Sequence, residues 1–158
     1  MEKFTFFWHG PLSQWEQSEF EIDGIKYNCA EQYMMAEKAS LFNDFDTLAS
    51  IMEAVHPRDQ KKLGRQVKNF NADRWNALAR DVVYDGNYAK FTQNADLLGK
   101  LLATRGTILV EASPYDCIWG IGMRETDEGV AERSNWKGTN WLGEVLTGLR
   151  EDLIEEGY

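Results

Sequence analysis

A change of hydrophobic period near residue 29 constrains the fold of this chain more than any other feature. In "EFEIDGIKYN", apolar and polar residues alternate on both sides of Asp23-Gly24. A two-residue Asp-Gly loop between alternating runs is typical of a β-hairpin, because both central residues need positive φ. Beyond Asn28, apolar residues recur at helical spacing instead. The sequence therefore predicts a hairpin over 19–28 and, directly after it, a helix over 29–42 with Asn28 as its N-cap.

The remaining periodicity predicts a mostly helical chain with a few short strands. Helices are expected at 44–54, 57–67, 72–85, 88–104 and 140–157, and strands at 4–8, 107–113 and 116–122. The dipeptide Gly86-Asn87 is expected to end a helix, and residues 123–138 to form a loop. These elements predict an α+β fold: a single, mostly helical domain over residues 1–158, with a small β-sheet that includes the N-terminal hairpin.

The net charge limits the partners of the chain. With 26 acidic against 17 basic residues, the formal charge is −9. Broad binding to a nucleic-acid backbone is disfavoured, because it needs clustered Lys and Arg. A small basic pocket for one phosphorylated ligand stays compatible with this charge. The basic run over 57–68 is typical of a solvated helix face, and a protein-docking face is its other interpretation.

The chain shows no pattern for a disulfide framework, a metal site or a membrane segment. Cys29 and Cys117 lie far apart, and the two histidines have no metal-ligand spacing. No apolar run has the length of a signal peptide or a transmembrane helix. The glycine motifs of ordinary nucleotide-binding folds do not occur. We therefore expect a cytoplasmic protein that uses neither a metal nor a cofactor.

Glu31 is the first candidate for chemistry, because it is an acid in the apolar setting "YNCAEQYMMAEKA". With Asn28 as N-cap it would occupy N3 and complete a capping box, which is a structural role. A helix N-terminus that opens onto a cleft also presents such a carboxylate to a ligand. Lys38 lies on the same helix face, about 10 Å further along the axis. That spacing suits a ligand held at two points, such as a sugar and its phosphate, although Lys38 alone is typical of a solvated residue.

Two further segments contain candidate residues. In "YDCIWGIG", Asp116 and Trp119 are three residues apart, and Gly120 lets backbone approach closely. A turn or bulge must separate Asp116 from Trp119 if both face one pocket. The structural alternative is an Asp held by loop amides and a Trp in the core. In "WKGTNWLG", Asn140 or Thr139 is placed to cap the last helix, and the backbone N–H groups there suit a phosphate.

Six segments together resemble the NADAR family of YbiA-like proteins, also described as riboflavin-biosynthesis-intermediate N-glycosidases. In order and spacing they are "FFWHGPLSQW", "EFEIDGIKYNCAEQYMMAEKASLFND", "KKLGRQVKNF…W", "YAKFTQNADLLGKLLAT", "LVEASPYDCIWGIG" and "WKGTNWLGEVLTGLRE". The resemblance covers roughly residues 4–154. It implies an α+β domain that hydrolyses N-glycosidic bonds of ribose-phosphate or ADP-ribose-type substrates. These are aminouracil intermediates of riboflavin synthesis in some members and ADP-ribosylated guanine in nucleic acid in others.

The resemblance also implies catalytic roles for Glu31 and Asp116. Our predicted substrate contacts are Lys38, Arg65, Trp75, Trp119, Gly120 and Asn140. Cleavage of the C1′–N bond develops oxocarbenium character, which a nearby carboxylate stabilises. We expect Glu31 to be the main carboxylate and to share a cleft with Trp119, in a reaction that needs no metal. A module that binds ADP-ribose or NAD without turning it over is the alternative, since it would use the same residues.

Overall fold

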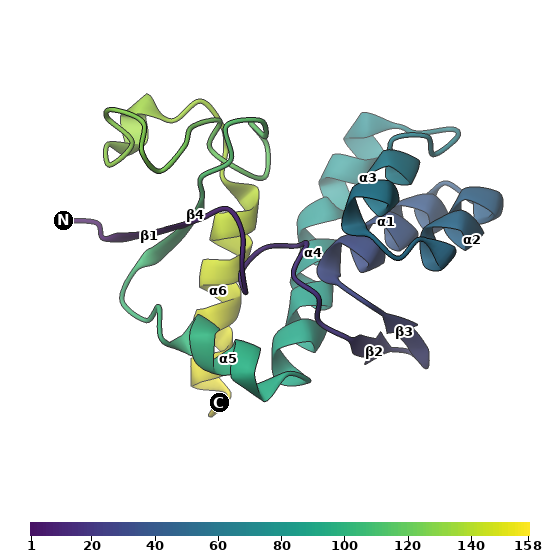
Figure 1. Cartoon of the computed structure of the whole chain (residues 1–158), viewed down its shortest axis with the longest axis horizontal. Helices are drawn as coiled ribbons and strands as arrows, with labels where there is room; N and C mark the ends of the chain where they lie inside the picture. The colour runs from purple at the N-terminus through teal and green to yellow at the C-terminus, as the bar shows by residue number, and fades with distance from the viewer. The chain divides into compact units, whose positions relative to one another are not determined.

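The computed structural model of the chain describes residues 1–158, which divide into two compact units. Unit 1 contains Met1–Ser13 and Asp96–Tyr158, and unit 2 contains Gln14–Ala95. Six α-helices and four short strands confirm the predicted α+β class, with helices dominant (Figure 1). That residues 1–158 make up one domain stays a prediction. None of the helices is long and apolar enough to span a bilayer.

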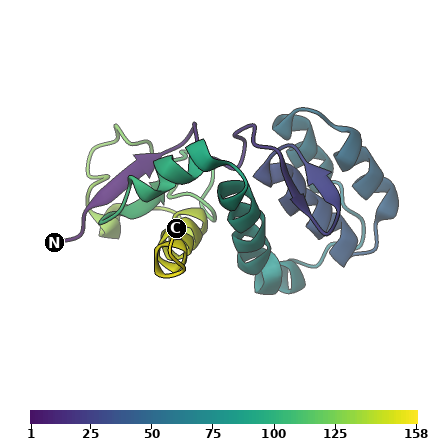
Figure 2. The same cartoon turned by 90° about the horizontal axis from the view of Figure 1, so that it is seen from below.

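Unit 2 begins with the predicted hairpin. Strands β2 (Phe20–Ile22) and β3 (Ile25–Tyr27) pair antiparallel across Asp23 and Gly24, which have φ of 52° and 80°. The Asp-Gly prediction is therefore confirmed, including the positive φ at both positions. The hairpin forms a two-stranded sheet of its own and lies beside the neighbouring helices α1 and α4 (Figure 2).

Four helices make up the rest of unit 2. They are α1 (Ala30–Leu41), α2 (Phe45–Glu53), α3 (Pro57–Gly64) and α4 (Ala72–Thr92). Helix α1 packs against the other three and is buried along most of its length (Figure 1). Helix α3 ends at Gly64, three residues earlier than predicted, where a Cβ would collide with the Met35 side chain of α1. The helix that carries Glu31 and Lys38 is thus the centre of unit 2.

The predicted end of a helix at Gly86-Asn87 is wrong, because α4 continues through both residues to Thr92. Gly86 lies under the Tyr33 ring, and a Cβ there would come within 2.7 Å of the ring. Asn87 donates a hydrogen bond to the carbonyl of Val83, one turn earlier. Close packing and a local hydrogen bond therefore override the weak helix propensity of Gly and Asn.

Unit 1 is built on two parallel strands and a covering helix. Strand β1 (Phe4–Phe7) pairs with β4 (Ile108–Glu111), and α6 (Trp141–Glu155) packs against β4. Helix α5 (Ala95–Leu102) precedes β4. The strands and the last helix were predicted, but the small sheet is in fact two separate two-stranded sheets, one in each unit.

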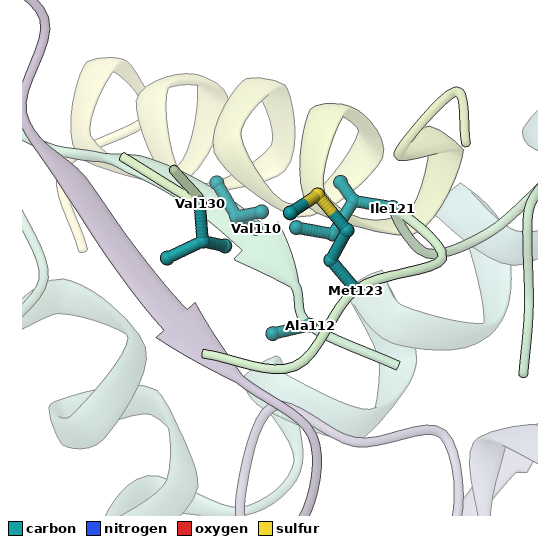
Figure 3. Packing of buried hydrophobic residues seen from close by; sticks show 5 residues of the cluster. All are labelled: Val110, Ala112, Ile121, Met123 and Val130. Atoms are coloured by element: carbon teal, nitrogen blue, oxygen red, sulfur yellow. The ribbon is translucent and has the colours of Figure 1, made fainter. Parts of the chain in front are cut away.

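The segment 116–122 is not a strand, which corrects that prediction. It forms turns, and Ile121 is the residue of this segment that packs in the core of unit 1. Figure 3 shows this core, which consists of Val110, Ala112, Ile121, Met123 and Val130. The following residues 123–138 form a loop as predicted, with one short 3₁₀ turn at Arg133–Asn135. Apolar content alone therefore did not distinguish a core-facing turn from a strand.

Candidate active site

The predicted site residues are divided between the two units. Unit 2 holds Glu31, Lys38, Arg65 and Trp75, and unit 1 holds Asp116, Trp119, Gly120 and Asn140.

Glu31 does not complete a capping box, so that prediction is wrong. Helix α1 begins one residue later than expected, with Cys29 as N-cap and no side-chain capping bond. Glu31 is therefore at N2. Gln32 takes the N3 position, and its Oε1 accepts a hydrogen bond of 2.8 Å from the backbone N–H of Asn28. The helix start thus explains Gln32 and leaves the acid at position 31 to be explained in another way.

The Glu31 carboxylate is nonetheless buried, with only 6% of the residue exposed. Its backbone N–H donates to the carbonyl of Gln14 (3.0 Å). The Gln14 side chain in turn accepts a hydrogen bond of 2.7 Å from the side-chain amide of Asn87 in α4. Because the N-terminal turn of a helix favours a negative charge, this location stabilises an ionised acid. The backbone of Glu31 is thus held in place while its side chain is buried.

A buried amine lies in the same part of unit 2, and nothing in the sequence singled it out. Lys90 of α4 is fully buried, with its Nζ 4.8 Å from the centroid of the Phe91 ring. Burial lowers the pKa of Lys90 to about 7, opposed by the nearby Glu16 carboxylate and Cys29. Burial also raises the pKa of the Cys29 thiol to about 11, with a further contribution from Glu31. Cys29 thus lies within the electrostatic reach of both Lys90 and Glu31.

Lys38 lies within electrostatic reach of both Glu31 and Arg65. Burial lowers the pKa of Lys38, the Glu31 carboxylate raises it, and the Arg65 guanidinium lowers it. These effects place Lys38 near each of the other two charges. The Lys38 Nζ also lies over the exposed ring of Phe70, 4.6 Å from its centroid. Helix α1 therefore has an acid in its first turn and a cation in its last turn, and Arg65 at the end of α3 lies near that cation.

Trp75 is buried, with 6% of the residue exposed, among the core residues of unit 2. Core packing explains this residue, and its contact with a ligand stays a prediction.

In unit 1, Asp116 organises the loop in which it lies. Its Oδ1 accepts hydrogen bonds from the backbone N–H groups of Ile118 (2.9 Å) and Trp119 (2.8 Å). The turn that the sequence required between Asp116 and Trp119 is therefore present, and Asp116 itself builds it. The second oxygen, Oδ2, forms no hydrogen bond within the chain. Trp119 is half-buried and stands edge-on to Trp141, with ring centroids 5.5 Å apart.

Asn140 joins the start of α6 to strand β4 and does not cap the helix with its side chain, which corrects that prediction. Its Oδ1 accepts from the backbone N–H of Glu111 (2.9 Å), and its Nδ2 donates to the carbonyl of Leu109 (3.0 Å). Thr139 donates instead to the carbonyl of Ile118. Asn140 has a φ of 54°, in the left-handed region that Asn tolerates better than most residues. The structural role of Asn140 therefore explains both its left-handed conformation and its hydrogen bonds.

Gly120 is required by close packing. A Cβ at this position would lie 3.0 Å from the carbonyl oxygens of Asp116 and Glu111, and 3.1 Å from Oε2 of Glu111. The sequence predicted a close approach of backbone, and the partner is the chain itself. Glu111 is a half-buried acid beside this loop that sequence reasoning missed, since its only signal is its place at the end of a strand.

Two further findings concern possible ligand sites. No cluster of three or more His, Cys, Asp or Glu side chains is placed to hold a metal ion. An open hollow of about 290 Å³ lies in unit 2 and contains none of the predicted residues. It is lined by Asn43, Asp44, Phe45, Asp46, Lys68 and Asn69.

The fold and the motifs of this chain are similar to those of known proteins. The solved structure of YbiA from Escherichia coli matches the chain with a TM-score of 0.80 and 28% identity, covering 99% of this chain and 88% of that one. In sequence, the N-glycosidase YbiA of E. coli is 30% identical over 148 residues, or 94% of this chain and 84% of that protein. The chain thus has the α+β fold of an N-glycosidase.

Two other relatives are more similar in sequence. The N-glycosidase R617 of Acanthamoeba polyphaga mimivirus is 41% identical over 165 residues, covering 96% of both chains. Protein irg-1 of Caenorhabditis elegans is 42% identical over 131 residues, covering 82% of this chain, and the match spans 62% of the length of that protein.

The NADAR domain family model matches residues 5–154. The chain therefore belongs to the NADAR family, as its motifs indicated. With relatives that are N-glycosidases over nearly its whole length, it is an enzyme of that class, a hydrolase acting on N-glycosyl compounds.

Proposed function

We propose that this chain hydrolyses the C1′–N bond of a ribose-phosphate or ADP-ribose-type substrate, with Glu31 as the main catalytic carboxylate. The observation that carries the proposal is the position of Glu31. Glu31 is buried at the first turn of α1, Gln32 takes the N3 position and bonds to the Asn28 N–H, and Lys38 lies within electrostatic reach of Glu31. Substrates of this type include aminouracil ribotides and ADP-ribosylated guanine.

The chemistry needs a carboxylate and a water molecule. As the C1′–N bond breaks, its electron pair leaves with the base and positive charge develops on the sugar. The Glu31 carboxylate stabilises that charge and takes a proton from the attacking water, whose oxygen forms the new bond to C1′. The departing base then receives a proton. Lys38 and Arg65 bind the phosphate, which fixes the sugar relative to the acid.

The proposed roles in unit 1 are secondary to that of Glu31. Asp116 retains Oδ2 for a ribose hydroxyl while its Oδ1 holds the loop. Trp119 offers a half-buried indole on which a flat base or the sugar stacks. Gly120, Asn140 and Trp75 are proposed to shape the site by packing, since each has a structural explanation.

The test is release of free base, measured by mass spectrometry, from aminouracil ribotides, ADP-ribosylated guanosine and NAD. We expect Glu31→Gln to lower the rate at least about 1000-fold, because the amide neither stabilises positive charge nor accepts a proton. Glu37→Gln is the matched control, since Glu37 is a half-buried acid on the same helix. It should retain activity within about threefold.

Two results would contradict the proposal. A folded Glu31→Gln protein with wild-type activity would remove Glu31 from the mechanism. Tight binding of ADP-ribose or NAD by the wild-type chain, with no base released from any substrate, would favour the non-catalytic binding module.

A further inference from the structure

Two hydrogen bonds in series join a buried amide of α4 to the start of α1, within unit 2. The Asn87 Nδ2 donates to the side-chain Oε1 of Gln14 at 2.7 Å. The main-chain carbonyl of the same Gln14 accepts from the backbone N–H of Glu31 at 3.0 Å. Because the first N–H groups of a helix have no partner within the helix, Gln14 supplies one that α1 lacks. The proposed mechanism uses neither Gln14 nor Asn87.

The orientation of both amides follows from their partners. The Val83 carbonyl can only accept, so the amide nitrogen of Asn87 is the atom that faces it, at 2.8 Å. The same nitrogen faces Gln14, which turns the Gln14 Oε1 toward Asn87 and leaves the Gln14 Nε2 3.9 Å from the sulfur of Met34. Asn87 thus donates twice, once within α4 and once to Gln14.

Stability does not explain an asparagine at position 87. Asn87 is fully buried, and its Oδ1 accepts no hydrogen bond within the chain. A buried carbonyl oxygen without a partner lowers stability, and an apolar side chain would avoid that cost. Natural proteins retain such groups mainly where function requires them. The donor side of Asn87, which holds Gln14, is the part of the residue that can have such a function.

The same turn of α4 also supports the start of α1 by packing. Gly86 lies under the ring of Tyr33, which follows Glu31 by two residues in α1. Two adjacent residues of α4 therefore hold the first turn of α1, Gly86 through its missing side chain and Asn87 through Gln14. Supporting contacts of this kind are needed to keep a catalytic side chain within about 0.5 Å of its productive position.

We propose that Asn87 is a positioning residue for Glu31 and that it acts through Gln14. The Asn87 amide fixes the Gln14 side chain, the Gln14 carbonyl fixes the backbone of Glu31, and the carboxylate is thereby directed at C1′ of the bound sugar. The inference rests on the proposed function in one respect, namely that Glu31 is the catalytic carboxylate. It goes beyond that function, because it assigns a role in the rate to two residues that do not contact the reacting atoms.

The first experiment measures kcat and KM for base release. Asn87→Ala should lower kcat about tenfold, because a carboxylate that leaves its productive position loses much of its effect. KM should stay within about twofold, since Lys38 and Arg65 are unchanged and the lost interaction matters in the transition state. A kcat within about twofold of the wild-type value, or a change in KM alone, would overturn the positioning role.

Asn94→Ala is the matched control. The Asn94 side chain, like that of Asn87, donates 2.8 Å to a carbonyl one turn earlier, that of Lys90. Its second bond goes to the carbonyl of Glu19 and not to Gln14. Asn94→Ala should therefore keep its kcat within about twofold. An equal loss of kcat in Asn87→Ala and Asn94→Ala would mean general damage to α4 and would overturn the inference.

A double-mutant cycle tests whether the two residues act in series. Gln14→Met keeps the main-chain carbonyl and nearly the size of the side chain, but it cannot accept a hydrogen bond from Asn87 as the amide oxygen does. Each single change should lower kcat about tenfold, and the double variant should lose no more than either. A loss of about a hundredfold in the double variant would mean that the residues act separately, which contradicts the proposal.

Hydrogen exchange of the Glu31 backbone amide, followed by NMR, separates this inference from the proposed function because it needs no substrate. Asn87→Ala and Gln14→Met should each raise the exchange rate about tenfold, since the Gln14 carbonyl is no longer held, and Asn94→Ala should not. Unchanged exchange in the first two variants rejects the inference. If Glu31→Gln is inactive while Asn87→Ala keeps its kcat, the inference fails and the proposed function stands. If Glu31→Gln retains its activity, the proposed function fails, and the exchange rates alone show whether Asn87 fixes the start of α1.

Discussion

The two units use their motif residues differently. In unit 1, Asp116, Gly120 and Asn140 are each explained by a loop hydrogen bond or by close packing. In unit 2, helix capping does not explain Glu31, because Gln32 takes the N3 position of α1. We therefore propose that the motif residues of unit 1 serve mainly as scaffold and that Glu31 of unit 2 serves mainly in catalysis. Substitutions should affect stability mainly in unit 1 and activity mainly in unit 2.

The largest effect on stability is expected for Asn140→Ala in unit 1. It removes two hydrogen bonds to β4, leaves buried backbone groups of Glu111 and Leu109 without partners, and puts Ala in a left-handed conformation. Together these should lower the free energy of unfolding by about 3 kcal/mol. The measurement is urea unfolding.

Asn135→Ala is the control for this change, because Asn135 is exposed and donates one hydrogen bond to the carbonyl of Gly129. Its effect should stay below about 1 kcal/mol. If the two variants were equally stable, Asn140 would not have the structural role in unit 1 that we assign to it.

The second prediction concerns a charge buried in unit 2. The folded state lowers the pKa of Lys90 from 10.5 to about 7. Between these values the unfolded chain holds a proton that the folded chain does not, so stability rises with pH over this range. Glu16 and Cys29 are among the groups that act on Lys90, and the Cys29 thiol stays neutral because its pKa is raised to about 11.

Relative to Lys90→Met, the wild-type protein should therefore gain about 2 kcal/mol of stability from pH 6 to pH 9. Urea unfolding of both proteins at the two pH values measures the gain. Lys62→Met, at an exposed position of α3, should show no such difference. A wild-type curve parallel to that of Lys90→Met would mean that Lys90 stays protonated throughout.

Sequence reasoning succeeded where the cause of a structure is local. The hairpin depends on two adjacent residues with positive φ, and both are as predicted. It failed where a distant residue decides. Gly86 stays helical because Tyr33 packs on it, and Asn140 bonds to a strand about thirty residues earlier in the chain. Neither partner is visible in the local pattern.

The candidate site shows the same limit. The structure places Lys38 within electrostatic reach of Glu31 and of Arg65, and the roles of these three residues in a site stay a prediction. The capping role of Glu31 was wrong by a shift of one residue, which is a usual error at helix ends. Lys90 was missed, because nothing in the local sequence distinguishes a fully buried lysine from an exposed one.

The third prediction tests whether Asp116 does more than build its loop. In Asp116→Asn the amide oxygen still accepts the two loop N–H groups, so stability should change by less than about 1 kcal/mol. If the second oxygen holds a ribose hydroxyl as a carboxylate, kcat/KM should fall about tenfold. Thermal unfolding and base release measure the two quantities. Full activity of a stable Asp116→Asn protein would make Asp116 a purely structural residue.

The smallest expected effect separates the neighbours Glu31 and Gln32 at the start of α1. Gln32→Ala removes the bond to the Asn28 N–H and another to the carbonyl of Ile51, both at a buried residue. Glu31→Gln keeps the shape of the side chain and removes a charge near the helix dipole, which contributes less than about 1 kcal/mol. Gln32→Ala should therefore be less stable than Glu31→Gln by about 1 kcal/mol in urea unfolding. If Glu31→Gln were instead the less stable variant, Glu31 would have a structural role. A loss of activity in Glu31→Gln would then be explained by damage to the start of α1.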